Sequence, residues 1–148
     1  GLAANKAIDR LRPLGEKKNI TIELNAPTDF IVDWDEERFT QLLTLLVDNA
    51  VKYTPENGAV QVKLADRSVK GERNMTVEVK DNGVGIAPEA LPRIFDRFYR
   101  QDKSRTRLTG GHGLGLAIAD QIVRSARGTI HVDSVVGQGT TFAVHLPL

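Results

Sequence analysis

The sequence predicts an α+β fold, a two-layer sandwich in which a mixed, mostly antiparallel sheet of about five strands is covered on one face by about three helices. Short runs of alternating apolar residues mark strands, most of which follow one another in adjacent pairs. Other segments carry apolar residues at helical spacing. Such an order of elements favours helices packed on one face of a sheet.

The composition fits a single globular domain. The chain has 148 residues, of which 41% are apolar and 26% charged. It has no cysteine, which excludes disulfides, thiolate metal sites and cysteine nucleophiles. A net charge of +1 gives no reason to expect nucleic-acid binding. No apolar run approaches the roughly 18 residues that span a bilayer, and no signal peptide is present, so we expect a soluble, cytoplasmic domain.

The first third of the chain is expected to contain two helices and two short strands. Residues 2–18 are predicted to form a helix, which Pro13 interrupts. Strands are predicted at 20–24 and 30–32 by their apolar residues. A second helix is predicted to begin at Asp35 as N-cap and to end before Pro55 and Gly58. Its apolar face comprises Phe39, Leu42, Leu43, Leu46, Val47 and Ala50.

The remaining elements are predicted in the same way. Residues 60–64 and 75–79 alternate as strands, and the charged segment 66–73 between them is expected to be an exposed loop. A glycine-rich region follows, and a helix then runs from about Leu114 to Arg127, before Gly128. Two closing strands are predicted around 130–132 and 142–146, with a turn between them marked by Gly137 and Gly139.

Asp81 is the first candidate functional residue. In the strand that ends at Asp81, its side chain is in phase with the buried residues Val77 and Val79, so a carboxylate on this face needs a partner. Gly83 and Gly85 follow and allow close backbone approach. An acceptor beside an open glycine loop suits an exocyclic amine such as that of adenine. An ordinary Asp-Asn-Gly turn explains the same residues equally well.

A second candidate site lies on the long helix. Leu45, Asn49, Lys52 and Tyr53 form a stripe beside its apolar face. An amide oxygen such as that of Asn49 can ligate Mg²⁺, and Lys52 can neutralise a phosphate. The alternative is an ordinary amphipathic boundary with a solvated lysine.

Two further segments indicate phosphate binding. In GGHGLGLAIADQIV, glycines 110, 111, 113 and 115 lead directly into a helix, whose free N–H groups can bind an anion. The spacing is neither that of a Walker loop nor that of a dinucleotide fingerprint. The preceding segment IFDRFYRQDKSRTRLT carries several cations and is expected to be a mobile lid. A glycine-rich linker and a solvated loop are the alternatives.

Taken in order, five motifs resemble those of the ATP-binding catalytic domain of bacterial sensor histidine kinases. LLVDNAVKYTP resembles the asparagine box, DNGVGIA the first glycine box and IFDRFYR the phenylalanine box. GGHGLGLAIA and GQGTTF resemble the second and third glycine boxes. The resemblance covers about residues 20–148 and implies the Bergerat fold shared with gyrase, Hsp90 chaperones and MutL, with nucleotide held between helix and lid.

The resemblance also implies roles for the residues around the nucleotide. Asn49 would ligate Mg²⁺ and, with Lys52 and the lid arginines, form the catalytic set, while Tyr53 would lie beside ATP. Asp81 would accept a hydrogen bond from the adenine amine. Gly85 and Thr140 would contact the base through ordered water, and Gly83 and Ile86 are also expected near it.

The lid is expected at about residues 96–112. Phe95 and Phe98 would anchor its base, and Arg97 or Arg100 would approach the γ-phosphate. The residues expected to clasp the phosphates are Gly111, His112, Gly113, Leu114, Gly115 and Leu116.

Two positions depart from the family pattern. Leu45 stands where a second asparagine is usual, which puts the coordination of Mg²⁺ in doubt. Hydrolysing relatives carry a glutamate there as general base, and leucine cannot take a proton, so phosphoryl transfer is favoured over hydrolysis. His112 stands where small residues are more usual.

The function implied is the transfer of the γ-phosphoryl of ATP to a histidine. The chain has no acceptor-histidine motif, so that histidine is expected on a separate dimerisation and phosphoacceptor domain. Residues 1–18 would be the end of the helical hairpin of that domain. Residues 19–148 would form the catalytic domain. Expected partners are that domain and a cognate response regulator. The domain itself is expected to be monomeric and its parent a homodimer at the cytoplasmic membrane. An ATP hydrolase, a non-enzymatic nucleotide-binding regulatory module and a serine kinase are the alternatives.

Overall fold

The computed structural model describes residues 2–96 and 115–148. Within them the first elements are β1 (Leu2–Ala3), α1 (Ala4–Leu11), the 3₁₀ helix η1 (Arg12–Lys18), β2 (Thr21–Asn25), β3 (Ile31–Val32) and α2 (Glu36–Lys52). They are followed by β4 (Ala59–Val69), β5 (Glu72–Asp81), the 3₁₀ helix η2 (Leu91–Arg93), α4 (Gly115–Ser125), β6 (Thr129–Val135) and β7 (Gly139–Pro147).

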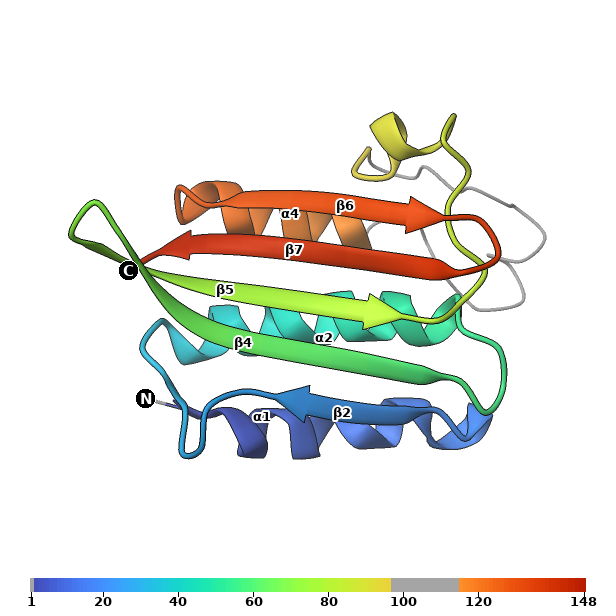
Figure 1. Ribbon diagram of the computed structural model, residues 1–148, viewed down its shortest axis with the longest axis horizontal. Coiled ribbons are helices and arrows are strands. Elements are labelled where there is room, and N and C mark those ends of the chain that lie inside the picture. The colour runs from blue at the N-terminus through green and yellow to red at the C-terminus, as the bar shows by residue number, and fades with distance from the viewer. Residues whose placement is uncertain (1, 97–114) are drawn as a thin grey trace.

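The main sheet of the described residues has five strands in the order β2-β4-β5-β7-β6. Strands β2 and β4 pair in parallel, and all other neighbours pair antiparallel. A separate antiparallel pair joins β1 to β3. Figure 1 shows the five strands side by side. The predicted mixed, mostly antiparallel sheet is confirmed.

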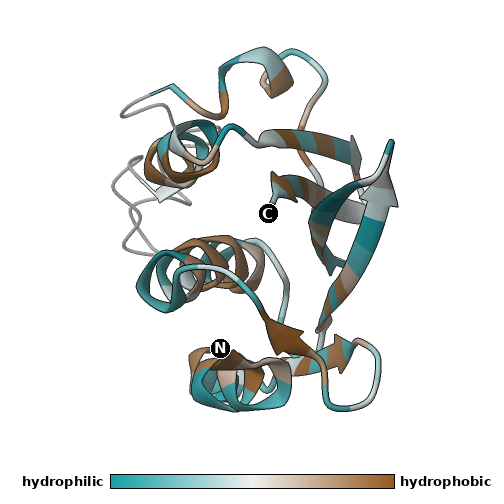
Figure 2. Cartoon of the chain, turned by 90° about the vertical axis from the view of Figure 1, so that its left-hand side faces the viewer, coloured by the Kyte–Doolittle hydropathy of each residue, from teal (hydrophilic) through white to brown (hydrophobic). Residues whose placement is uncertain are grey.

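The α-helices of the described residues, α1, α2 and α4, all lie on one face of the sheet, as Figure 2 shows. Within residues 2–96 and 115–148, no α-helix covers the other face. The core between the two layers comes from the alternating residues of the strands and the apolar face of α2. Its fully buried side chains include Phe39, Leu43, Leu46, Val60, Leu64, Met75, Phe142 and Leu146.

Helix α2 is fixed at both of its ends. At its start, the carboxylate of Asp35 accepts a hydrogen bond from the Arg38 N–H at 2.9 Å, which confirms the predicted N-cap. At its end, the Lys18 ammonium donates to the carbonyls of Val51 and Lys52, at 2.8 and 3.2 Å. These carbonyls belong to the last turn of the helix, where that of Val51 also accepts a backbone N–H at 3.3 Å, and Lys18 places its positive charge at the negative end of the helix dipole.

The predicted single helix over residues 2–18 is wrong. Leu2 and Ala3 form a strand, α1 ends at Leu11, and the chain continues as a 3₁₀ helix from Arg12 to Lys18. Pro13 explains the break, because proline has no N–H to donate and its ring clashes with the preceding turn. Helix α1 nevertheless buries Ala4, Ala7, Ile8 and Leu11 in the same core as α2.

The predicted loop over residues 66–73 is also wrong. Strands β4 and β5 continue to Val69 and Glu72, so only Lys70 and Gly71 form the turn. Both have positive φ, of 53° and 80°, as a two-residue hairpin turn of type I′ requires. The strands pair here through their backbones and bury little, so no apolar alternation marks them in the sequence.

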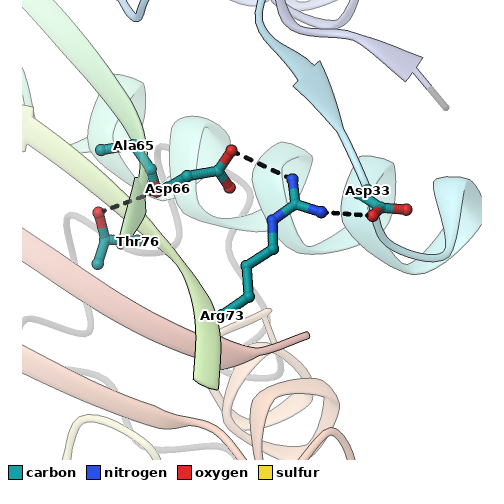
Figure 3. Close-up of polar contacts among 5 residues, drawn as sticks. All are labelled: Asp33, Ala65, Asp66, Arg73 and Thr76. Carbon is teal, nitrogen blue, oxygen red and sulfur yellow. Dashed lines mark hydrogen bonds and ion pairs between the residues drawn. The ribbon is translucent and has the colours of Figure 1, made fainter. Parts of the chain in front are cut away.

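A surface network ties this hairpin to the segment that leads into α2. The Arg73 guanidinium donates to Asp33 at 2.7 Å and to Asp66 at 3.2 Å (Figure 3). The hydrogen bond and charge of Asp66, and after them those of Asp33, raise the pKa of Arg73 against an opposing desolvation. Among the helices of the described residues, none is long and apolar enough to cross a membrane.

The two termini and the functional end of the sheet lie apart. Both chain ends are at the left of Figure 1, whereas the C-terminal ends of α2 and β5 are at the right. The turn between β6 and β7 lies at the right as well. The site described below is built at that end.

Candidate functional site

A pocket lies where the end of α2, the end of β5 and the start of β7 meet. The antiparallel register of β5 and β7 sets Asp81 opposite Thr140. Helix α2, which runs in the same direction as β5 in Figure 1, brings its last turns to the same place. The residues that line the pocket are Asn49, Tyr53, Asp81, Ile86, Ile94, Leu116 and Thr140.

Asp81 is buried, with 4% of its surface exposed, as its phase in the strand predicts. Its Oδ1 atom accepts hydrogen bonds from the N–H groups of Gly83, at 2.8 Å, and Thr140, at 3.3 Å. Burial raises the pKa of the carboxyl, and the two N–H donors oppose that rise. The two interpretations of this stretch are therefore compatible, because Oδ1 closes the turn while Oδ2 has no hydrogen bond among the described residues.

The first glycine loop passes close to the backbone of its neighbours. A Cβ atom on Gly83 would stand 2.2 Å from the Tyr53 carbonyl oxygen. Gly85 has φ of +78°, and a Cβ atom there would stand 2.4 Å from the Val135 carbonyl oxygen. The Val84 N–H also donates to the Tyr53 carbonyl, at 3.1 Å. The glycines therefore let one loop pack against both α2 and the β6–β7 turn.

The predicted stripe on α2 divides into two parts. Asn49 and Tyr53 line the pocket. Lys52 does not line it; its ammonium lies 3.1 Å from the carboxylate of Asp48, one helical turn earlier. Leu45 packs against the core, and its methyl carbon is the nearest atom, at 3.8 Å, to the point where a Cβ on Gly115 would stand.

Three apolar side chains form the walls of the pocket, and one of them was not predicted from the sequence. Ile86 and Leu116 were expected there, and Ile94 joins them. Phe95 instead packs its ring edge-on against Phe142, with centroids 6.2 Å apart and planes at 78°. The two bulky residues are adjacent in the sequence, but Phe95 anchors the segment against the core whereas Ile94 faces the pocket.

Several expected site residues lie outside the described residues. They are Arg97, Phe98, Arg100, Gly111, His112, Gly113 and Leu114. Of the expected lid, only Asp96 is described. Gly115 is the first residue of α4, and Leu116 directly after it reaches the pocket.

Ser134 was also missed, although it connects two of the segments that form the pocket. Its hydroxyl accepts a hydrogen bond from the Ile86 N–H at 2.7 Å and donates to the Gly139 carbonyl at 3.1 Å. It also lies 2.8 Å from the Thr140 hydroxyl. In β6, Ser134 is in phase with the inward residues Ile130 and Val132. A polar residue in phase with apolar ones is the pattern that identified Asp81, and it could have identified Ser134.

The comparisons with known proteins agree with this geometry. Residues 34–148 match the family model described as histidine kinase-, DNA gyrase B-, and HSP90-like ATPase. The sensor histidine kinase WalK of Bacillus subtilis is 40% identical over 141 residues, which are 95% of this chain and 23% of WalK. The chain thus spans about a quarter of the length of that relative.

Two solved structures are similar over nearly the whole chain. The mycobacterial sensor histidine kinase MprB has a TM-score of 0.77 at 28% identity, covering 99% of this chain and 96% of that one. Full-length ShkA, solved in complex with AMPPNP, has a TM-score of 0.76 at 30% identity, covering 97% of this chain and 28% of ShkA. The chain therefore belongs to the histidine kinase-, DNA gyrase B- and HSP90-like ATPase family, as a catalytic ATP-binding domain of the two-component sensor histidine kinase type.

Proposed function

We propose that this domain binds Mg-ATP in the pocket, with adenine at Asp81 and the phosphates between Asn49 and the start of α4, and donates the γ-phosphoryl to a histidine on a separate helical domain of the same protein. The observation that carries the proposal is the layout of the pocket. A buried carboxylate and a helix amide belong to one cavity whose walls are apolar.

The base end of the pocket suits adenine. Ile86, Ile94 and Leu116 offer apolar surface to a flat ring. The Oδ2 atom of Asp81 offers an acceptor to the exocyclic amine, since Oδ1 is already engaged by two N–H groups. A hydrogen bond from an amine to a buried carboxylate is stronger than one between neutral groups, because its acceptor is charged.

The other end of the pocket suits a magnesium ion that is held mostly by the nucleotide. Asn49 presents a hard amide oxygen. Among the described residues, no group of three or more His, Cys, Asp or Glu side chains could hold a metal. Mg²⁺ in phosphoryl-transfer sites commonly takes one or two protein ligands and completes its octahedron with phosphate oxygens and water. Bound there, the ion would neutralise charge on the phosphates.

Leu45 supports transfer over hydrolysis. It lies one turn before Asn49, on the same stripe, and packs against the core. Leucine can neither accept a proton from water nor orient it. Phosphoryl transfer depends mainly on positioning and on neutralisation of charge, so it does not need such a base from this helix.

The expected phosphate and lid contacts remain part of the proposal. Gly111 to Leu116 would bind the phosphates at the N-terminus of α4, and Lys52 could join them by leaving Asp48. Arg97 or Arg100 would approach the γ-phosphate. The phosphoacceptor domain, a cognate response regulator and a homodimeric, membrane-bound parent are the partners and setting that we infer from the relatives.

Calorimetry tests the binding step. Mg-ATP titrated into the domain should give saturable heat followed by a flat baseline. Heat that continues after saturation would mean hydrolysis and would contradict the argument from Leu45. A folded sample that gives no binding heat would contradict the proposed site itself.

A transfer assay tests the reaction. The domain, with radiolabelled Mg-ATP, is added to the helical domain of the full-length protein that carries the candidate histidine. Label that is stable in alkali and lost in acid indicates phosphohistidine. Label that survives acid would indicate the serine kinase, and absence of label in a domain that binds ATP would indicate the regulatory module.

A further inference from the structure

Ser134 lies behind the pocket and does not line it, yet its hydroxyl contacts three groups at the base end of the pocket. The contacts are the Ile86 N–H, the Gly139 carbonyl and the Thr140 hydroxyl, at 2.7, 3.1 and 2.8 Å. Of these three residues, Ile86 and Thr140 line the pocket. Ser134 is half-buried and Thr140 is 6% exposed.

The directions of these hydrogen bonds follow from counting protons. A serine hydroxyl has one proton to donate and two lone pairs. The Ile86 N–H can only donate, so it uses one lone pair of Ser134. The Gly139 carbonyl can only accept, so it takes the Ser134 proton. The remaining contact therefore requires Thr140 to donate its own proton to Ser134.

This orientation fixes what Thr140 offers to a ligand. Because its proton points away to Ser134, its Oγ1 atom presents only lone pairs to the pocket. The neighbouring Asp81 presents an acceptor as well, through Oδ2. Two acceptors at one end of the pocket match a group with two N–H donors, such as the amino group of adenine.

Resting on the proposed function, we propose that Ser134 is a positioning residue that holds the Thr140 hydroxyl as an acceptor and thereby increases the preference for a nucleotide with an amino group on its base. Without Ser134, the Thr140 proton is free to turn into the pocket, where it opposes an incoming amine. Ser134 thus acts on base selection through Thr140, without touching the nucleotide.

The test compares ATP with purine riboside triphosphate, which lacks only the amino group. The dissociation constant of purine riboside triphosphate divided by that of ATP measures how much the amino group contributes to binding. In Ser134→Ala the ratio should fall roughly two- to tenfold, the range for loss of one hydrogen bond. A matched Ser→Ala control is Ser125→Ala, whose hydroxyl donates to Ile122 on the exposed side of α4 and which should leave the ratio unchanged.

A role that is only structural predicts a different result. If Ser134 merely joins the two loops, Ser134→Ala weakens both nucleotides equally and the ratio stays constant, which would overturn the inference. In a Thr140→Val background, which keeps the Thr140 N–H bond to Asp81, Ser134→Ala should cause no further change in the ratio. A further fall there would also contradict action through Thr140.

Thr140→Val alone keeps the test decisive if Ser134→Ala does not fold. This variant should itself lower the ratio, and an unchanged ratio would refute the proposal. The proposed function is judged separately, by whether the unmodified domain binds Mg-ATP. Binding of ATP with an unaltered ratio in every variant would remove the inference and leave the proposed function standing.

Discussion

At the scale of single residues, Asp81 combines a structural role with the binding role that we propose for the same carboxylate. Its Oδ1 atom holds the Gly83 and Thr140 N–H groups, which fixes the geometry of the loop and the start of β7. Its Oδ2 atom is left for a ligand. The two roles can be separated by a substitution that keeps the first oxygen and changes the second.

Asp81→Asn is such a substitution. The asparagine oxygen can still accept both backbone N–H groups, but its NH₂ group would meet the adenine amine donor to donor. We expect ATP affinity to fall about 10- to 100-fold, from the roughly 1.5–3 kcal/mol of a hydrogen bond to a charged group. Calorimetric titration measures the loss, and circular dichroism checks the fold. Unchanged affinity would refute the assignment of Asp81.

The raised pKa of Asp81 predicts a pH dependence of binding. Protonation places a hydrogen on the free Oδ2, because Oδ1 is occupied by two donors. ATP affinity should therefore decline on acidification, beginning at a higher pH than for an ordinary aspartate. Calorimetric titrations between pH 5 and 8 measure the decline in ATP affinity. Asp81→Asn is the control, because its affinity should change only with protonation of the ATP phosphates.

The same pKa shift predicts the effect on stability, with the opposite sign. A carboxyl whose folded pKa is raised contributes stability that is fully present below its unfolded pKa and is lost as pH rises through the folded pKa. Asp81→Asn should thus be no less stable than the unmodified domain at neutral pH. Urea unfolding followed by the fluorescence of the single tryptophan, Trp34, measures the difference. Marked destabilisation at neutral pH would contradict burial as the dominant cause.

At the scale of elements, the site depends on loops and helix ends being held in place. The glycine loop after β5 packs on the β6–β7 turn, and α2 is capped by a lysine from η1. Neither arrangement follows from apolar periodicity, since both rest on backbone groups. The glycines can be recognised in the sequence as permissive positions, but the backbone that each of them approaches cannot.

Gly85 and Gly71 form a matched pair that tests the close approach. Their φ angles are +78° and +80°, but a Cβ on Gly85 would meet the Val135 carbonyl, whereas one on Gly71 would meet nothing within 4 Å. Alanine at either position should cost about 1–2 kcal/mol for the left-handed backbone. We expect Gly85→Ala to cost more and to weaken ATP binding, and Gly71→Ala to leave binding unchanged. Urea unfolding measures the stability of each variant, and calorimetric titration measures its ATP affinity. Equal effects of the two substitutions in both measurements would contradict the close approach of Gly85 to the Val135 carbonyl.

Lys18 provides the test for the capped end of α2. Lys18→Met keeps the length of the side chain and removes the ammonium that bonds the Val51 and Lys52 carbonyls. We expect a loss of about 1 kcal/mol of unfolding free energy. The control is Lys17→Met, at an exposed position of the same 3₁₀ helix, which should change stability little. Similar losses in the two variants would show that the cap contributes nothing.

At the scale of the whole molecule, apolar patterning was sufficient to predict the layers. Val60 and Val62 alternate where β4 crosses the core, and Leu42 and Leu46 repeat where α2 covers it, so these elements were predicted correctly. The outer half of the β4–β5 hairpin buries little and was mistaken for a loop. Among the residues that line the pocket, Asp81 and Asn49 were predicted, whereas Ile94 reaches it through contacts between segments far apart in the chain. Ser134, behind the pocket, could have been recognised as a polar residue in phase with apolar ones.

Helix α1 is part of this same core, although the family match begins only at residue 34. Ile8 is fully buried, and Leu11 is buried beside it. Ile8→Ala should therefore destabilise the domain by about 2–5 kcal/mol, as large-to-small changes in a core do. Leu14→Ala, at a side chain 38% exposed, should have a small effect. Urea unfolding that finds Ile8→Ala harmless would show that α1 is not integral to the domain.

The position of both termini at the end of the sheet opposite the pocket has a practical consequence for handling the molecule. A biotin tag, a fluorescent protein or a solid support attached at either terminus would lie at the end of the fold that carries the β4–β5 hairpin. The end that carries the pocket would then face the solution. The domain can therefore be immobilised in either polarity for surface-based binding measurements. The two polarities should report the same affinity, which makes one an internal standard for the other.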